Sequence, residues 1–241
     1  MKKLLSLICM VTCLTYLNAQ PPVYDDLLIL YADANYPKLI KECLKYSEKD
    51  ETKNDAIVFL YLSKAYYKIS FIADRDEEFK NAYKDCFGAI GKCLKKDKEG
   101  KLFEKEADFF NEVKKTLVEV ITNELEAKDY RKTASWASKA YKITPVDIGA
   151  KYLEGACKYR SADKGGANAL WKEADKLLGT VTSTEKMTKN DMDLLKMGIF
   201  ETAQCYIDMR QPDKAKALVG KVAQWFENDE TFKAKYDEIV N

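Results

Sequence analysis

The apolar residues of the chain recur three and four positions apart, the spacing that places side chains on one face of an α-helix. One such stripe consists of Phe79, Tyr83, Phe87, Ile90 and Leu94, and another, from Phe109 to Leu125, marks a long helix that we expect to begin near Lys101. Further helices are expected around Tyr152–Tyr159, at Ala215–Trp225 and at Glu230–Ile239. No segment alternates as a strand would, so the pattern predicts an all-α protein.

The breaks between these helices are short and polar, as antiparallel helix hairpins require. They fall at Asp33–Asn35, Ala73–Asp76, Lys128–Asp129, Asp163–Gly166 and Arg210–Pro212. The longest polar connection is Thr180–Asn190, with Asn190 or Asp191 as a candidate helix cap. No linker is rich enough in Gly, Ser or Pro to divide the chain, so we expect one domain over residues 20–241.

Three segments align with one another: YPKLIKECLKYSEKDE from Tyr36, YRKTASWASKAYKITP from Tyr130, and PDKAKALVGKVAQWFE from Pro212. The helices before them carry a small residue and an aromatic one three places on: Ser63 and Tyr66, Ala156 and Tyr159, Ala203 and Tyr206. Small residues let two helices approach closely, and aromatic residues fill the groove to the next pair. The recurrence therefore predicts stacked helix pairs.

This pattern resembles the tetratricopeptide repeat family, whose unit has about 34 residues in two helices. Ser63, Ala156 and Ala203 match its small position, the tyrosines three places on match its aromatic position, and Pro145 matches its closing proline. The resemblance covers most of residues 24–227 and implies a superhelical array of antiparallel helix pairs in about five degenerate repeats. The sequence departs from the family in extra residues around Phe71–Glu78, a long insertion before the fifth unit, and Thr133 in place of alanine.

The resemblance also implies a concave face lined by the first helix of each pair, where a peptide or protein partner would bind. The residues expected on that face are Tyr24, Tyr31, Leu60, Lys64, Tyr67, Lys68, Leu125, Arg160, Gln204 and Asp208. Tyrosine and arginine are frequent interface anchors, and the cations Lys64, Lys68 and Arg160 are candidates to clamp a carboxylate or an acidic peptide. The alternative is an ordinary mixed surface.

Residues 1–19 have the form of a secretory signal peptide: Lys2 and Lys3, an apolar run from Leu4 to Leu17, and a small residue at Ala19. The run is short for a membrane span, which needs roughly 20 residues. The pattern predicts export to the periplasm or cell envelope of a Gram-negative bacterium. An uncleaved anchor is the alternative, and a lipid anchor fits less well, because Ile8 and Thr12 precede the cysteines at positions 9 and 13.

Composition narrows the possible chemistry. The 241 residues contain no histidine, which excludes Ser-His and Cys-His nucleophile systems and histidine-rich zinc sites. A net charge of +1 argues against nucleic-acid binding driven by bulk charge. The cysteines at 43, 86, 93, 157 and 205 form no Cys-x-x-Cys motif and are expected to be buried.

Two charged runs have simple interpretations. The acidic positions Asp74, Asp76 and Glu78 lack the glycine and the last ligand of a calcium loop. The run Lys92–Lys98 is interpreted as a solvated helix C-terminus, where cations suit the helix dipole. We therefore expect no metal, no cofactor and no nucleic acid.

The hypothesis that follows is an exported binding scaffold rather than an enzyme. Its main alternative is a structural subunit of an envelope secretion or nutrient-uptake assembly, docked through its convex face or through the last helix. A third possibility is an envelope hydrolase that uses two carboxylates, although no catalytic pattern supports it.

Overall fold

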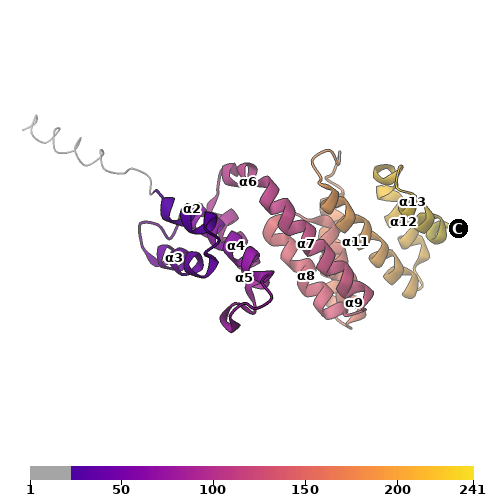
Figure 1. The fold of residues 1–241 in the computed structure, drawn as a ribbon. Coiled ribbons are helices and arrows are strands. Elements are labelled where there is room, and N and C mark those ends of the chain that lie inside the picture. Colours follow the sequence, from indigo (N-terminus) through magenta and orange to yellow (C-terminus); the bar gives the residue numbers. More distant parts are fainter. Residues whose placement is uncertain (1–22) are drawn as a thin grey trace, which may run out of the picture.

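The computed structural model describes residues 23–241, so the expected signal peptide lies outside the described residues. Successive helices follow one another from α2 at one end of an elongated molecule to α13 at the other (Figure 1). The helices are α2 (Asp25–Ala32), α3 (Tyr36–Glu48), α4 (Ala56–Ser70), α5 (Ala82–Lys96), α6 (Lys101–Lys105), α7 (Ala107–Glu126), α8 (Tyr130–Ile143), α9 (Ile148–Arg160), α10 (Lys164–Leu178), α11 (Lys189–Asp208), α12 (Pro212–Val222) and α13 (Glu230–Val240), with short 3-10 helices η1 (Glu77–Phe79) and η2 (Ala223–Phe226).

The expectation of an all-α protein is confirmed for residues 23–241, which contain helices and no strand. Consecutive helices pack as neighbours, with α3 on α2, α5 on α4, α8 on α7, α10 on α9 and α12 on α11. The long helix expected near Lys101 is interrupted at Glu106, where the short α6 ends and α7 follows. No helix in this part of the chain is long and apolar enough to cross a membrane.

Four of the turns between paired helices have the same backbone geometry. Each places a residue other than glycine in the left-handed region: Ala34 (φ 54°), Lys128 (φ 57°), Ala162 (φ 69°) and Arg210 (φ 58°). At Ala162, its N–H donates to the Tyr159 carbonyl at 3.0 Å, and the N–H of Asp163 donates to the Lys158 carbonyl at 2.9 Å. This pair of bonds is the Schellman motif, which satisfies the last carbonyls of a helix.

The residue after three of these turns begins the next helix with a side-chain cap. Asn35, Asp129 and Asp163 each accept a hydrogen bond from the backbone N–H three residues on. The connection between α4 and α5 lacks this turn and contains η1 instead, at the extra residues that the sequence indicated. A recurring turn of this kind explains why short polar breaks occur at regular places.

Two hydrophobic cores run through the molecule and meet at α9. The first extends from α2 to α8 and includes Ala150, Leu153 and Cys157 of α9. The second extends from α9 to α13 and includes Ile148, Tyr152 and Ala156 of the same helix. Every residue of α9 from position 148 to 157 is buried.

Close approach of the backbones explains how α9 is enclosed. A Cβ on Gly149 would lie 2.3 Å from the backbone of Leu194 in α11, and a Cβ on Gly198 would lie 2.2 Å from the carbonyl oxygen of Gly149. On the other side, a Cβ on Gly155 would lie 2.5 Å from the Trp171 indole nitrogen. Helices α7 and α11 also contact each other. The arrangement therefore differs from a stack in which the first helix of every pair is open on one side.

Candidate functional site

Three aromatic rings surround the ammonium group of Lys64 on α4, and one of them, Tyr31 of α2, is an expected binding residue. This group lies 5.6 Å from the ring centre of Tyr31, 6.0 Å from that of Tyr61 and 5.6 Å from that of Phe109. It also forms an ion pair of 2.7 Å with Glu106. Lys64 therefore joins α2, α4 and the start of α7, and its charge is already neutralised.

The other two cations of the expected clamp are also paired. Lys68 lies 3.5 Å from Glu112, and Arg160 lies 2.5 Å from Glu201 while its guanidinium stands over the ring of Tyr130 at 5.0 Å. Arg160 lies far along the chain from Lys64 and Lys68, at the end of α9. Each of the three cations thus has a carboxylate partner within the protein.

The remaining expected residues have mixed positions. Leu60 and Tyr67 are buried in the core, so they provide packing and no open contact area. Tyr24 donates a hydrogen bond to Asp55 and packs edge-on against Tyr46. Leu125, Gln204 and Asp208 come from α7 and α11, and Gln204 donates to Asp208 at 3.0 Å.

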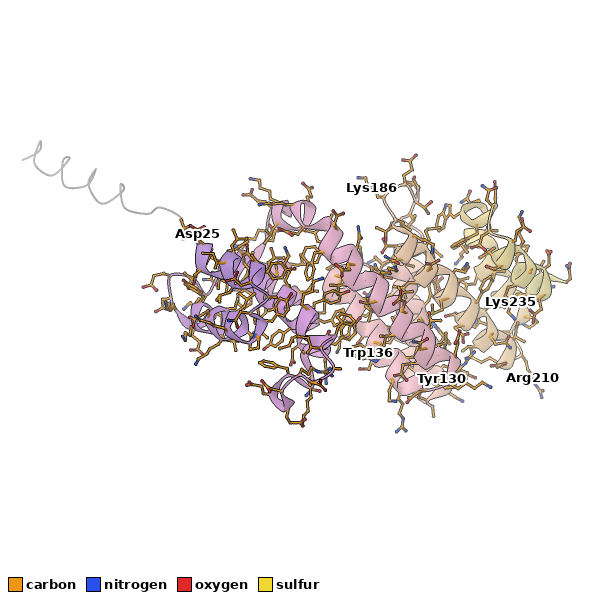
Figure 2. All side chains as sticks on the ribbon, in the orientation of Figure 1. Asp25, Tyr130, Trp136, Lys186, Arg210 and Lys235 are labelled. Carbon is orange, nitrogen blue, oxygen red and sulfur yellow. The ribbon has the colours of Figure 1, made fainter. Side chains whose placement is uncertain are left out.

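A cleft that sequence reasoning did not predict lies between the start of α9 and the connection that leads into α11. We call it the loop cleft; its volume is about 410 Å³. Its lining consists of Thr144, Val146, Asp147, Ile148, Gly149, Leu177, Thr180, Val181, Thr182, Ser183, Lys186, Met187, Asp191 and Leu195. In Figure 2 Lys186 projects from this connection at one edge of the molecule, and Tyr130 and Arg210 lie at the opposite edge.

A buried ion cluster adjoins the loop cleft and shares Thr144, Asp147 and Asp191 with its lining. The ammonium group of Lys114, on α7, donates to Asp147 at 2.6 Å, to Asp191, and to the Thr144 hydroxyl at 3.2 Å. Lys114 is 2% exposed. Three helices, α7, α9 and α11, are therefore tied together at one point.

Both carboxylates of this cluster also cap helices. Asp147 accepts from the backbone N–H of Ala150 at 2.8 Å and so begins α9. Asp191 accepts from the backbone N–H and the hydroxyl of Thr188, each at 2.7 Å, in a capping box that begins α11. Their negative charge also suits the positive ends of the two helix dipoles.

Electrostatics keep Lys114 and Asp191 ionised at neutral pH. Burial by itself lowers the pKa of Lys114, but the adjacent Asp147 and Asp191 outweigh it, so that the pKa lies above its usual value. Burial by itself raises the pKa of Asp191, and the charge and hydrogen bonds of Lys114 and Thr188 reverse the shift to below the usual value. The lining residue Asp191 is thus charged at neutral pH and held in place by Lys114 and Thr188.

The walls of the loop cleft combine apolar surface with a few polar groups. Ile148, Leu177 and Leu195 provide apolar surface, and hydroxyls at positions 180, 182 and 183 provide a polar rim.

The five cysteines of residues 23–241 are buried, and burial raises the pKa of Cys43 to about 12 and that of Cys205 to about 11. No group of three or more His, Cys, Asp or Glu residues suited to a metal ion is found in that part of the chain.

One signal in the sequence points to this cluster. Lys114 falls inside the apolar stripe of α7, between Val113 and Leu117, where a charged residue needs a buried partner. Asp191 was identified only as a candidate cap, and the connection before it only as long and polar. The pairing partner could not be read from the sequence, because Lys114 and Asp191 are 77 positions apart.

A scan against protein-family models and a search of curated proteins found no match to this chain.

Proposed function

We propose that the protein is an exported scaffold that binds an extended segment of a protein partner, with one apolar side chain of that segment inserted in the loop cleft. The cleft carries this proposal. Its volume of about 410 Å³ lies within the usual range for binding pockets, and it combines apolar walls with a few polar groups at its rim.

The rigid frame around the cleft favours binding without rearrangement. The Lys114 cluster fixes the starts of α9 and α11, and the close crossing of Gly149 and Gly198 holds the same two helices in contact. A preformed site loses less entropy on binding, which increases affinity. Export is supported by the residue pattern at positions 1–19, and the envelope of a Gram-negative bacterium is the proposed location.

The test uses two exposed valines. Val146, at the cleft, is 60% exposed, and Val23, outside it, is 72% exposed. Each is replaced by aspartate, and the two variants and the wild type are recovered from the native envelope by affinity purification with quantitative mass spectrometry. We expect Val146→Asp to lose the partner and Val23→Asp to retain it. Equal recovery with both variants would exclude the cleft as the contact site.

A second candidate function is a structural subunit of an envelope assembly. It is favoured by Phe71 and Ile72, which are 60% and 43% exposed at the connection after α4. An Ile72→Asp variant in the same purification separates the two proposals. Loss of a stoichiometric complex with this variant, and not with Val146→Asp, supports the structural subunit.

A further inference from the structure

Charge is divided unequally between the helices of a pair. Helix α8 carries Arg131, Lys132, Lys139 and Lys142 and has no acidic residue, and α5 carries Lys84, Lys92, Lys95 and Lys96 against the single acid Asp85. Helix α7, which is paired with α8, is acidic: it has Asp108, Glu112, Glu119, Glu124 and Glu126 against Lys114 and Lys115. Near-neutrality of the whole chain thus conceals a basic surface on α5 and α8.

This surface, which we call the lysine strip, consists of Lys84, Lys92, Lys95, Lys96, Lys98, Lys139 and Lys142. It follows two adjoining clefts that share Lys92. One cleft, of about 370 Å³, lies between α3, α4, α5 and α8, and the other, of about 740 Å³, continues past the end of α5. Along α5, the stretch from position 84 to 96 rises roughly 18 Å at 1.5 Å per residue. The strip shares no residue with the loop cleft.

The lysines of the strip have no acidic partners within residues 23–241. None lies within 4.0 Å of a carboxylate oxygen, whereas Lys64, Lys68, Lys114 and many others do. Lys96 donates to the Asn54 side chain at 2.9 Å. The pKa of Lys139 is lowered, first by burial and then by repulsion from Lys84 and Lys142. An anion bound here would relieve that repulsion.

The first cleft of the strip also has apolar surface. Leu44, which is 42% exposed, and the partly buried Tyr66 line it, together with the buried Leu62 and Phe87 and one acid, Asp85. In the second cleft the ammonium groups of Lys92 and Lys96 stand 5.6 Å and 5.2 Å from the ring centre of Phe59. A ligand that carries only negative charge would leave this apolar surface uncovered.

We propose that the lysine strip binds an acidic peptide segment whose carboxylates alternate with apolar side chains, supplied by a partner protein. The carboxylates meet unpaired ammonium groups, and the apolar side chains cover Leu44 and Tyr66. Polyphosphate satisfies the charge and leaves the apolar surface bare, and a flat lipid surface does not enter two recessed clefts. The proposal is independent of the loop cleft.

The experiment measures fluorescence anisotropy of a labelled peptide, Glu-Leu-Glu-Phe-Glu-Leu-Glu-Glu, titrated with the purified protein. The test variant is Lys84→Gln, Lys92→Gln and Lys139→Gln together, which keeps most of each aliphatic stem. The matched control is Lys101→Gln, Lys189→Gln and Lys233→Gln, which removes the same charge from lysines that already have acidic partners. We expect the test variant to bind roughly tenfold more weakly and the control to bind within about twofold of wild type.

Salt and competing probes decide between the possible ligands. Affinity for the peptide is expected to fall as salt rises, because exposed charges are screened. An all-glutamate peptide of the same length is expected to bind more weakly, since it cannot cover the apolar surface of the strip. Equal binding of the two peptides would overturn the peptide assignment, as would tighter binding of polyphosphate or of phosphatidylglycerol-containing vesicles. Equal affinities of test variant and control would overturn the site.

Discussion

Helices α4 and α9 are each the first helix of a pair, yet they are enclosed to different degrees. Seven residues of α4 remain partly exposed: Ala56, Ile57, Tyr61, Lys64, Tyr66, Lys68 and Ser70. In α9 every residue from Ile148 to Cys157 is buried, including Lys151 and Glu154. The same kind of helix pair therefore produces an open face at one place and a central helix at another.

The difference follows from side-chain size and from one buried cation. Helix α9 has Gly149 and Gly155 where α11 and Trp171 approach, whereas α4 contains no glycine. Lys114 then draws α7 to the start of both α9 and α11. Small residues and the shared charge of Lys114 thus explain why α9 is enclosed by its neighbours.

The largest effect is expected from the buried cation Lys114, with the partly exposed Lys64 as its comparison. Lys114→Ala leaves Asp147 and Asp191 without their buried partner, and we expect a loss of about 3–5 kcal/mol in the free energy of unfolding. Lys64→Ala removes a partly exposed pair with Glu106, and the expected loss is about 1 kcal/mol. Urea denaturation measures both.

A triple variant shows whether charge is the reason. Lys114→Met together with Asp147→Asn and Asp191→Asn removes the charges, and asparagine at position 147 still caps α9 as well as aspartate does. We expect it to recover part of the stability lost in Lys114→Ala. No recovery would mean that the shape of the lysine, not its charge, holds α7 against α9 and α11.

Glycines give the next effect. Gly198→Ala places a Cβ 2.2 Å from the Gly149 carbonyl oxygen, and we expect a loss of about 1–3 kcal/mol from overpacking. The control is Gly88→Ala on α5, where a Cβ meets nothing within 4 Å, and a gain of up to about 1 kcal/mol is expected there from helix propensity. If Gly198→Ala is as stable as wild type, the crossing is not the reason that α9 is enclosed.

Low pH should weaken the ion cluster of Lys114, Asp147 and Asp191 that joins α7, α9 and α11. The pKa of Asp191 is lowered in the folded protein, so the stability contributed by its ionised form is present above the unfolded pKa and is lost as pH falls through the folded value. We expect the free energy of unfolding to decrease below about pH 4. The decrease should be smaller in Asp191→Asn. Identical pH profiles for the two proteins would contradict a role for this carboxylate.

The turns give the smallest effect. Ala162 ends α9 with φ 69°, a conformation that glycine adopts without strain, so Ala162→Gly is expected to raise stability by up to about 1 kcal/mol. Ala169→Gly, at an exposed position within α10, is expected to lower it by about 1 kcal/mol. Thermal unfolding of the two variants tests both signs, and a loss with Ala162→Gly would contradict the assigned turn strain.

Much of the helical architecture follows from the sequence, because its causes are local. The apolar stripe of Phe79–Leu94 predicted the face that α5 buries, and the polar breaks at Lys128–Asp129 and at Asp163 predicted turns that the structure places there. Periodicity and turn chemistry act within a few residues, so they can be read directly. The left-handed conformation at these turns could not be read from the sequence, since none of the four residues that adopt it is a glycine.

The environments of the expected binding residues were predicted less well, because they depend on contacts between helices that are distant along the chain. Lys64 and Tyr31 do meet, because α2 and α4 are adjacent, but Leu60 and Tyr67 are in the core. The carboxylates that neutralise Lys64 and Arg160 come from α7 and α11, and the tertiary structure alone brings them there. Helix periodicity does not tell which of two partly apolar faces a neighbour will cover.

The sequence by itself determined that the chain is helical, where its helices turn, and that its chemistry must manage without histidine. Only the tertiary structure decided that α9 is central, that Lys114 joins Asp147 and Asp191, and that the lysines of the lysine strip stand together without acidic partners among residues 23–241. Local rules govern dihedral angles and caps within one turn of helix. Burial and charge pairing depend on residues that are distant along the chain, 77 positions for Lys114 and Asp191, and these meet only when the helices pack.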